Sequence, residues 1–338
     1  MVKDAWMSLQ LPNSNVQCLA CNHHCRISPA HKGICGVRKN IDGSLKILVY
    51  GRASAVNIDP IEKKPLFHFY PGSQIFSFGT VGCNFRCDFC QNWQISQYHR
   101  CHQDNDITHS GIALSPEEII KQCLELKIPS IAFTYNEPGI FFEYAFDTAK
   151  LAKENGIHTV YVSNGFENQA ALEKIRPYLD AINTDLKALS DDYYRKICSG
   201  NIKPVKDNIR WIWENGIWQE ITTLIVTNHN DSEDELKRLA EFLVKISPDM
   251  PWHISRYFPA YKMKEPPTPL KTLKMAYKIG KETGLRYVYV GNVRTDDLEN
   301  TICPSCGQTL IERIEYKVST HLQGASCPKC GLKIPGRF

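Results

Sequence analysis

Residues 79–93, GTVGCNFRCDFCQNW, decide the fold of this chain. They follow residues 74–79, QIFSFG, a short apolar segment bounded by a turn, which is typical of a buried strand. The loop after this strand carries three cysteines in the spacing C-x3-C-x2-C, namely Cys83, Cys87 and Cys90. In barrels of parallel strands, the loops after the strands carry the chemistry. The segment therefore predicts a sheet and places the reactive residues at the edge where its strands end.

Outward from this segment, short apolar strands alternate with amphipathic helices from residue 73 to about residue 292. The expected strands are 74–79, 130–135, 158–163, 181–187, 218–226, 252–258 and 287–291. The expected helices are 115–127, 139–156, 168–179, 232–246 and 269–284. The first helix carries a capping box formed by Ser115 and Glu118. The pattern predicts an α/β fold, a partial (β/α)6 TIM-like barrel over residues 71–294.

Two smaller regions flank the barrel. Residues 1–70 form an N-terminal cysteine-rich, metal-binding appendage, with a hairpin expected at the turn of residues 40–43. Residues 295–338 form a C-terminal zinc-ribbon-like module.

Composition excludes several classes of function. The net charge of +4 on 338 residues is small, and Lys and Arg are scattered, so nucleic acid is not indicated as a partner. No run of 18 apolar residues predicts a membrane span, and the first residues lack the pattern of a signal peptide, so we expect a cytoplasmic protein. Eleven of the 14 cysteines fall into three groups with metal-ligand spacing. Of the isolated Cys101, Cys123 and Cys198, Cys123 is expected to be a buried, inert thiol.

The central cysteines predict an iron–sulfur cluster. Thiolates are soft ligands, and three of them on a four-iron cubane leave one iron without a protein ligand. A zinc knuckle, or an electron-transfer cluster with a distant fourth cysteine, is the alternative. The position of the loop at a strand end favours a catalytic iron–sulfur cluster.

The C-x3-C-x2-C run of Cys83, Cys87 and Cys90 resembles the signature of the radical S-adenosylmethionine (SAM) superfamily. The surrounding residues 79–97 are similar to the radical SAM component of the AmmeMemoRadiSam system, a branch that resembles the activating enzymes of pyruvate formate-lyase and other glycyl radical enzymes. The likeness covers nearly the whole chain. It implies an oxidoreductase whose [4Fe-4S] cluster cleaves SAM reductively to methionine and a 5′-deoxyadenosyl radical, which abstracts hydrogen from a substrate.

The same resemblance places SAM contacts on the strand ends. Residues 133–138, FTYNEP, resemble the Gly-Gly-Glu motif that receives the SAM ammonium group, which gives Asn136 and Glu137 to the site. Tyr135 and Asn136 stand where the motif has glycines. As an alternative, Glu137 is an acidic residue at a helix N-terminus.

Further strands contribute polar residues by resemblance. Ser163 and Asn164 resemble the pair that contacts the SAM ribose and carboxylate, although Ser-Asn-Gly is also an ordinary turn. Asp185 and Lys187 share one face of their strand and are assigned to the site, with an internal ion pair as the alternative.

Three expectations concern the nucleoside end of SAM. His253 shares a strand face with Ser255 and Tyr257 and is placed near the ribose, with a satisfied core histidine as the equal alternative. Phe89 is expected to pack on the adenine, and residues 287–291 are expected to form the far wall.

Two groups of four cysteines remain. The C-terminal group has paired CPxCG knuckles, which predict a structural zinc, with a rubredoxin-like iron or a cluster as the alternative: Cys303, Cys306, Cys327 and Cys330. The N-terminal group can hold zinc or an auxiliary cluster: Cys18, Cys21, Cys25 and Cys35. His23 and His24 are interleaved with it. Because its segment is short and polar, zinc is slightly favoured there.

The expected partners are SAM and an external electron donor such as flavodoxin or ferredoxin, with a protein substrate or system partners left open. The runner-up function is a glycyl radical enzyme activating enzyme. Two-cluster activases carry their extra cysteines in an insertion after the triplet, whereas this chain carries them at its two ends. The rivals from other classes are an iron–sulfur electron carrier and a zinc-ribbon binding module.

Overall fold

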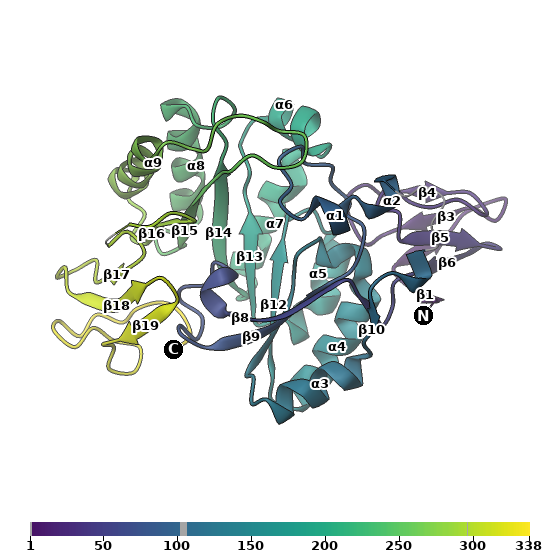
Figure 1. Ribbon diagram of the computed structural model, residues 1–338, viewed down its shortest axis with the longest axis horizontal. Helices are drawn as coiled ribbons and strands as arrows, with labels where there is room; N and C mark the ends of the chain where they lie inside the picture. The colour runs from purple at the N-terminus through teal and green to yellow at the C-terminus, as the bar shows by residue number, and fades with distance from the viewer. Residues whose placement is uncertain (1, 102–106, 296) are drawn as a thin grey trace.

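The computed structural model describes residues 2–101, 107–295 and 297–338, and its centre is an eight-stranded sheet (Figure 1). The strand order is β16-β15-β14-β13-β12-β11-β9-β8, in which β8 is antiparallel to β9 and the others are parallel. The strands are β8 (Ala55–Pro60), β9 (Gln74–Gly79), β11 (Ser130–Phe133), β12 (His158–Ser163), β13 (Ala181–Asp185), β14 (Trp218–Ile225), β15 (Trp252–Arg256) and β16 (Val288–Gly291). Because β16 and β8 end this order, the sheet is open. Each strand expected from the sequence is present.

Crossover helices join the parallel strands, as the alternating pattern predicts. The long helices are α3 (Pro116–Glu125), α4 (Phe142–Glu154), α5 (Gln169–Ile175), α7 (Ile202–Glu214), α8 (Glu233–Ile246) and α9 (Leu270–Thr283). The capping box of Ser115 and Glu118 begins α3. Helix α7 is absent from the sequence-based expectations; Asn201 caps it, and Val205 and Ile209 lie on its buried face. Short segments are α1 (Trp93–Ser96), α2 (Tyr98–Cys101), α6 (Asp191–Tyr193), η1 (Ile61–Lys63), η2 (Ile107–His109), η3 (Pro138–Phe141), η4 (Arg176–Tyr178) and the π-helical η5 (Tyr194–Cys198).

The N-terminal region packs against the sheet and α4. Its strands are β1 (Lys3–Asp4), β2 (Ser8–Gln10), β3 (Val16–Cys18), β4 (Arg26–Ile27), β5 (Arg38–Ile41), β6 (Ser44–Ile47) and β7 (Arg52–Ala53), which pairs with β10 (Ile112–Ala113). The predicted hairpin joins β5 to β6 through Asp42 and Gly43, both with positive φ, as a two-residue turn requires. The buried Arg38 forms an ion pair with Glu143 of α4 at 2.5 Å, which links the region to this helix.

The C-terminal strands are β17 (Thr301–Ile302), β18 (Thr309–Ile314) and β19 (Lys317–Thr320), at the opposite end of the sheet from the N-terminal strands (Figure 1). Leu310 and Ile311 belong to a buried cluster that also contains Phe67 and Tyr289. The C-terminal tail returns to residues 66–70, where the Tyr70 amide donates to the Arg337 carbonyl at 2.7 Å. This module and the sheet therefore share a core.

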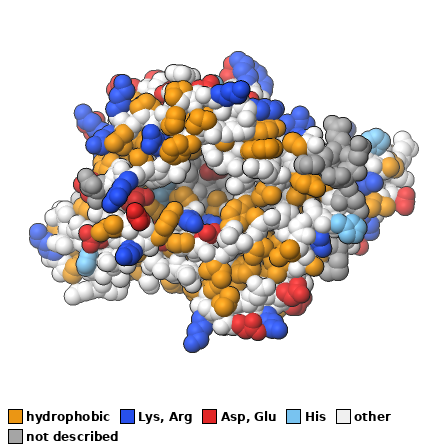
Figure 2. All heavy atoms as spheres, in the orientation of Figure 1, with side chains coloured by type: hydrophobic (Ala, Val, Ile, Leu, Met, Phe, Trp, Pro, Cys, Tyr) orange, Lys and Arg blue, Asp and Glu red, His pale blue; other side chains and the backbone are white. Residues whose placement is uncertain are grey.

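The visible surface carries no single basic patch. On the face shown in Figure 2, Lys and Arg side chains are spread over the outline and interleaved with Asp and Glu. No helix in the described part of the chain is long and apolar enough to cross a membrane.

Candidate active site

A cavity of about 280 Å³ lies at the carboxyl ends of the parallel strands. Its wall combines the cysteine loop after β9 with residues from the ends of five further strands. The lining residues that matter below are Cys83, Cys87, Phe89, Cys90, Asn136, Glu137, Asn164, Asp185, Lys187, Thr222, Leu224 and Ser255. The structure thus brings together the triplet and six of the eight other residues assigned by resemblance; Ser163 and His253 do not line the cavity.

The cysteine loop is held from both sides. Asn136 Nδ2 donates to the Gly82 carbonyl at 2.9 Å, and its Oδ1 accepts from the Thr80 amide at 3.2 Å. Gly82 has φ +90°, and an added Cβ would lie 2.5 Å from the Cys35 carbonyl, so a side chain has no room there. On the other side, the Arg86 amide donates to the Cys198 carbonyl at 2.8 Å. Asn136 therefore positions the loop with its side chain.

Asn84, which follows the first cysteine of the triplet, links three elements. Its Oδ1 accepts from Asn164 Nδ2 at 2.7 Å, and its carbonyl accepts from His23 Nε2 at 2.9 Å. Cys83 Sγ lies 3.6 Å from the same Oδ1. The sequence did not indicate this role. An asparagine between two cysteines is typical of a loop, and the residues that Asn84 contacts are distant in the chain.

Glu137 holds the end of β12 in place. Its Oε2 accepts from the Asn164 amide at 2.8 Å, and its Oε1 accepts from the Gly139 amide at 3.0 Å. Ser163 Oγ lies 3.1 Å from both oxygens and donates to Glu167 Oε1 at 2.6 Å. Burial, and then the neighbouring Glu167 carboxylate, raise the pKa of Glu137. A cation brought beside this acidic pair would relieve both effects.

Tyr135 adopts the left-handed backbone that a glycine would allow. Its φ is +68°, which is uncommon for a side chain of this size. The phenol donates to Asp59 Oδ2 at 2.8 Å, and the ammonium of Lys64 lies 4.7 Å from the ring centroid. These contacts stabilise a conformation that the resembling motif obtains from glycine.

Asp185 and Lys187 form an ion pair inside the cavity wall, with Nζ and Oδ2 2.7 Å apart. Burial lowers the pKa of Lys187, but Asp185, Cys87 and Cys198 together outweigh it, so the net pKa is raised. The ammonium also lies 5.6 Å from the ring centroid of Phe89. The pair leaves Asp185 about one third exposed toward the cavity.

His253 is placed elsewhere. Its Nε2 lies 2.7 Å from Glu220 Oε2, and its ring stacks on Tyr289 with centroids 5.1 Å apart. The cavity is reached by Ser255, two residues further along the same face of β15, so His253 lies roughly 7 Å deeper. The alternation of residues along β15 predicts which face of the strand carries His253, but not how far its side chain lies from the cavity. The observed contacts are those of the alternative, a core histidine with its hydrogen bond satisfied.

Thr222, Leu224 and Cys198 are further residues that sequence reasoning did not assign. The first two come from β14 and line the cavity. Cys198 is buried in η5, close to Cys87 of the triplet. The sequence places Thr222 and Leu224 in the expected strand 218–226 and assigns Cys198 no function. Only the fold shows that the two strand residues reach the cavity.

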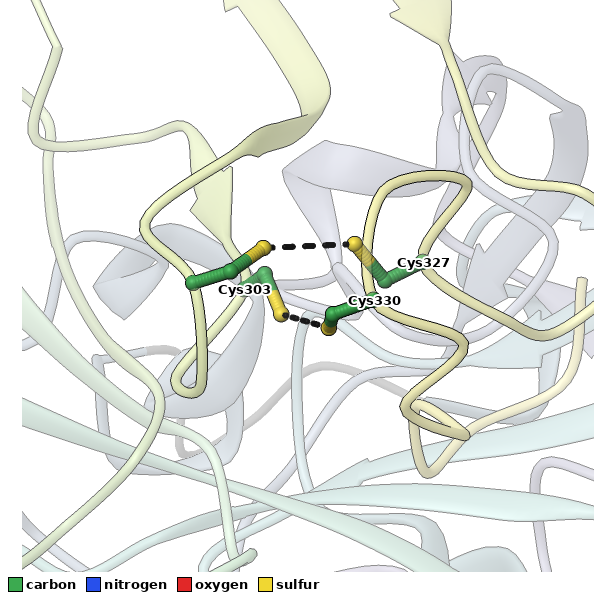
Figure 3. A group of neighbouring side chains, drawn as sticks. Cys303, Cys327 and Cys330 are labelled. Atoms are coloured by element: carbon green, nitrogen blue, oxygen red, sulfur yellow. Dashed lines mark hydrogen bonds between the residues drawn. The ribbon is translucent and has the colours of Figure 1, made fainter.

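The C-terminal cysteines form a compact group. Cys303, Cys306, Cys327 and Cys330 have sulfurs that all lie within 4.8 Å of one another. Two cross-knuckle pairs, Cys303 with Cys330 and Cys306 with Cys327, are each separated by 3.6 Å. Figure 3 shows side chains of the two knuckles pointing toward one another, with dashed lines joining their sulfurs in two pairs.

Comparison with known proteins agrees with this geometry. The family model described as the Radical SAM superfamily matches residues 78–243. An uncharacterized protein of Methanocaldococcus jannaschii is 39% identical over 338 residues, covering 98% of this chain and 99% of that protein. The chain belongs to the radical SAM superfamily. The pyruvate formate-lyase-activating enzyme of Clostridium pasteurianum is 26% identical over 174 residues, covering 49% of this chain and 67% of the relative.

Two solved structures share the fold. A radical SAM methyltransferase from Sphaerobacter thermophilus gives a TM-score of 0.51 at 16% identity, covering 66% of this chain and 67% of that one. Streptococcus suis SuiB bound to S-adenosylmethionine gives a TM-score of 0.51 at 13% identity, covering 69% of this chain and 53% of that one. At these identities the likeness concerns the fold alone.

Proposed function

We propose that this radical SAM protein is an oxidoreductase that cleaves SAM reductively and uses the resulting radical to remove hydrogen from an unactivated carbon. The observation that carries the proposal is that Cys83, Cys87 and Cys90 face one cavity lined by five other strand ends. Three thiols fit a [4Fe-4S] cluster with one open iron. When bound, the cluster supplies the single electron that breaks a bond of the SAM sulfonium to give methionine and the 5′-deoxyadenosyl radical.

The protein residues would bind and orient SAM. Asp185 presents a partly exposed carboxylate, and Lys187 is the buried cation beside it, suited to pair with a carboxylate of the ligand. Glu137 and Asn164 fix the loops around the cluster, and the acidic pair of Glu137 and Glu167 favours a cation such as the SAM ammonium nearby. Phe89 offers an aromatic face to the adenine.

We propose that the substrate is a molecule other than pyruvate formate-lyase. The electron comes from an external donor such as flavodoxin or ferredoxin. Supporting this view, the extra cysteines stand at the two ends of the chain and not in an insertion after the triplet. Glycyl radical activation is the second candidate, and it is favoured by the relatives named as activating enzymes.

We further propose that the C-terminal group binds a structural zinc ion. Zinc–thiolate bonds of about 2.3 Å in a tetrahedron place sulfurs roughly 3.8 Å apart. The two cross-knuckle distances of 3.6 Å are close to this value.

The test is anaerobic reconstitution with iron and sulfide, followed by dithionite and SAM. We expect equal amounts of 5′-deoxyadenosine and methionine, and none from the Cys83→Ala/Cys87→Ala/Cys90→Ala variant. Cys101→Ala, which changes an exposed cysteine outside the three groups, is the control and should keep the yield. Absence of 5′-deoxyadenosine from fully reconstituted protein would refute the proposal.

The substrate is tested by incubation with a glycyl radical enzyme and, separately, with extract fractions. We expect one fraction to raise 5′-deoxyadenosine formation above the level without substrate, and no glycine-centred doublet in electron paramagnetic resonance (EPR). A clear doublet would contradict the substrate assignment and establish the activase.

A further inference from the structure

The N-terminal cysteines surround a second small cavity. Four thiols line it, three of them buried and one half-buried: Cys18, Cys21, Cys35 and Cys25. The rest of the wall is mainly apolar, with Ala20, Ile27, Ile34 and Ile140. Four thiols around one buried cavity are a complete ligand set for either zinc or a [4Fe-4S] cluster.

The spacing of the sulfurs separates these two possibilities. Over residues 2–101, 107–295 and 297–338, the C-terminal cysteines form a group whose ligand atoms all lie within 4.8 Å of one another, and the N-terminal cysteines form no such group. One tetrahedral ion draws its thiolates to roughly 3.8 Å apart. A cubane holds its thiolates further apart, because each binds a different iron. The wider N-terminal spacing therefore suits a cluster.

The central triplet supplies an internal comparison. Cys83, Cys87 and Cys90 also line a cavity, and among the residues that the structure describes they belong to no compact group. The N-terminal group thus resembles the triplet in lining a cavity with separated thiols, and it differs from the knuckles. We propose that Cys18, Cys21, Cys25 and Cys35 bind a second [4Fe-4S] cluster, in place of the zinc that their short polar segment favours.

Asn84 connects the two sites. It follows Cys83 in the triplet loop and lines the N-terminal cavity. Its Nδ2 is buried, with no acceptor in the described part of the chain, so its N–H groups are free to donate to a thiolate or sulfide there. The Cys35 carbonyl also lies against Gly82, directly before the triplet. The two clusters are therefore neighbours.

A buried cation makes the N-terminal cavity suitable for an anionic cluster. Arg38 lines it, and its guanidinium donates to the Ile140 carbonyl at 2.9 Å and pairs with Glu143. A metal centre held by four thiolates carries net negative charge, and the guanidinium beside it stabilises this charge, an effect that the paired Glu143 reduces. All four irons have protein ligands, so this cluster should not bind SAM, and the proposal is independent of radical chemistry at the triplet.

The experiment uses the full chain with Cys83→Ala/Cys87→Ala/Cys90→Ala, so that only the two terminal groups remain. After anaerobic reconstitution with iron, sulfide and zinc present together, we expect about four iron and about four sulfide ions per chain. Dithionite should produce an EPR signal of a reduced [4Fe-4S] cluster that added SAM leaves unchanged. Protein without iron and sulfide but with zinc at both ends would overturn the proposal.

A second measurement guards against misfolding of that variant. Wild-type protein should hold about eight iron ions, and Cys18→Ala/Cys21→Ala should reduce this to about four. In doubly reduced wild type, the EPR signals should be broadened by spin–spin coupling between neighbouring clusters, and the Cys18→Ala/Cys21→Ala variant should lose the broadening. About four iron ions in both proteins would contradict the second cluster.

Discussion

The C-terminal knuckles and the central triplet show how differently two cysteine groups can be built on one chain. In the knuckles, each sulfur faces another across 3.6 Å, and strands β17 to β19 hold them at one end of the molecule. In the triplet, the three thiols face a cavity of about 280 Å³ whose other walls are strand ends. Sulfurs that converge on one another complete a coordination shell, whereas sulfurs that face a cavity leave a position for chemistry.

Removal of one cysteine of the triplet should have the largest effect. Cys87→Ala should reduce 5′-deoxyadenosine formation to background, because two thiolates do not hold a reactive cubane, while the zinc content stays unchanged. Cys198→Ala is a matched control, since its thiol adjoins that of Cys87 without belonging to the triplet. Iron content and product yield are measured for both. Equal loss of iron in Cys198→Ala would mean that the ligand set is misassigned.

Replacement of a cysteine in the knuckles should lower the stability of the protein and leave SAM cleavage intact. Cys303→Ala should release the C-terminal metal and lower the melting temperature, because Leu310 and Ile311 share a core with Phe67 and Tyr289. The residual folded protein should retain cluster iron and SAM cleavage. Metal analysis and calorimetry test this, and a variant with unchanged melting temperature would show that no structural metal is bound there.

The sequence predicted the sheet well because each parallel strand is buried on both faces and bounded by turns. It omitted α7, whose Pro204 lies in the first turn, where proline is tolerated. Most of the strand-end residues assigned to the site line one cavity, because a parallel sheet brings its carboxyl ends together. The contacts of Asn84 and the distance of His253 from the cavity depend on segments that are far apart in the chain. The periodicity of the sequence carries no information on such contacts.

A smaller effect should come from the charged pair of the cavity. Asp185→Asn keeps the shape and removes the charge beside Lys187, so the Kd of the reconstituted protein for SAM should rise roughly 10-fold, or about 1.4 kcal/mol. Asp192→Asn alters a surface carboxylate paired with Lys196 and serves as the control. Titration of the cluster EPR signal with SAM measures both. An unchanged Kd in Asp185→Asn would remove this pair from the proposed binding site.

The smallest effect is expected at His253. His253→Gln should leave the Kd for SAM within about 2-fold, because the ring contacts Glu220 and Tyr289 below the cavity. Stability should fall by about 1–3 kcal/mol, the range for a disturbed buried hydrogen bond. Denaturant unfolding and SAM titration separate the two readouts. A much weaker SAM affinity at unchanged stability would return His253 to the site.

We propose that the triplet cluster keeps an iron open to the cavity and that SAM binds this iron. Electron–nuclear double resonance on the reduced cluster, with SAM labelled with ¹⁵N in its amino group and ¹⁷O in its carboxylate, tests it most directly. We predict hyperfine coupling to both labels in wild type and none in the Cys83→Ala/Cys87→Ala/Cys90→Ala variant. A reduced wild-type cluster that shows no coupling at saturating SAM would contradict the account.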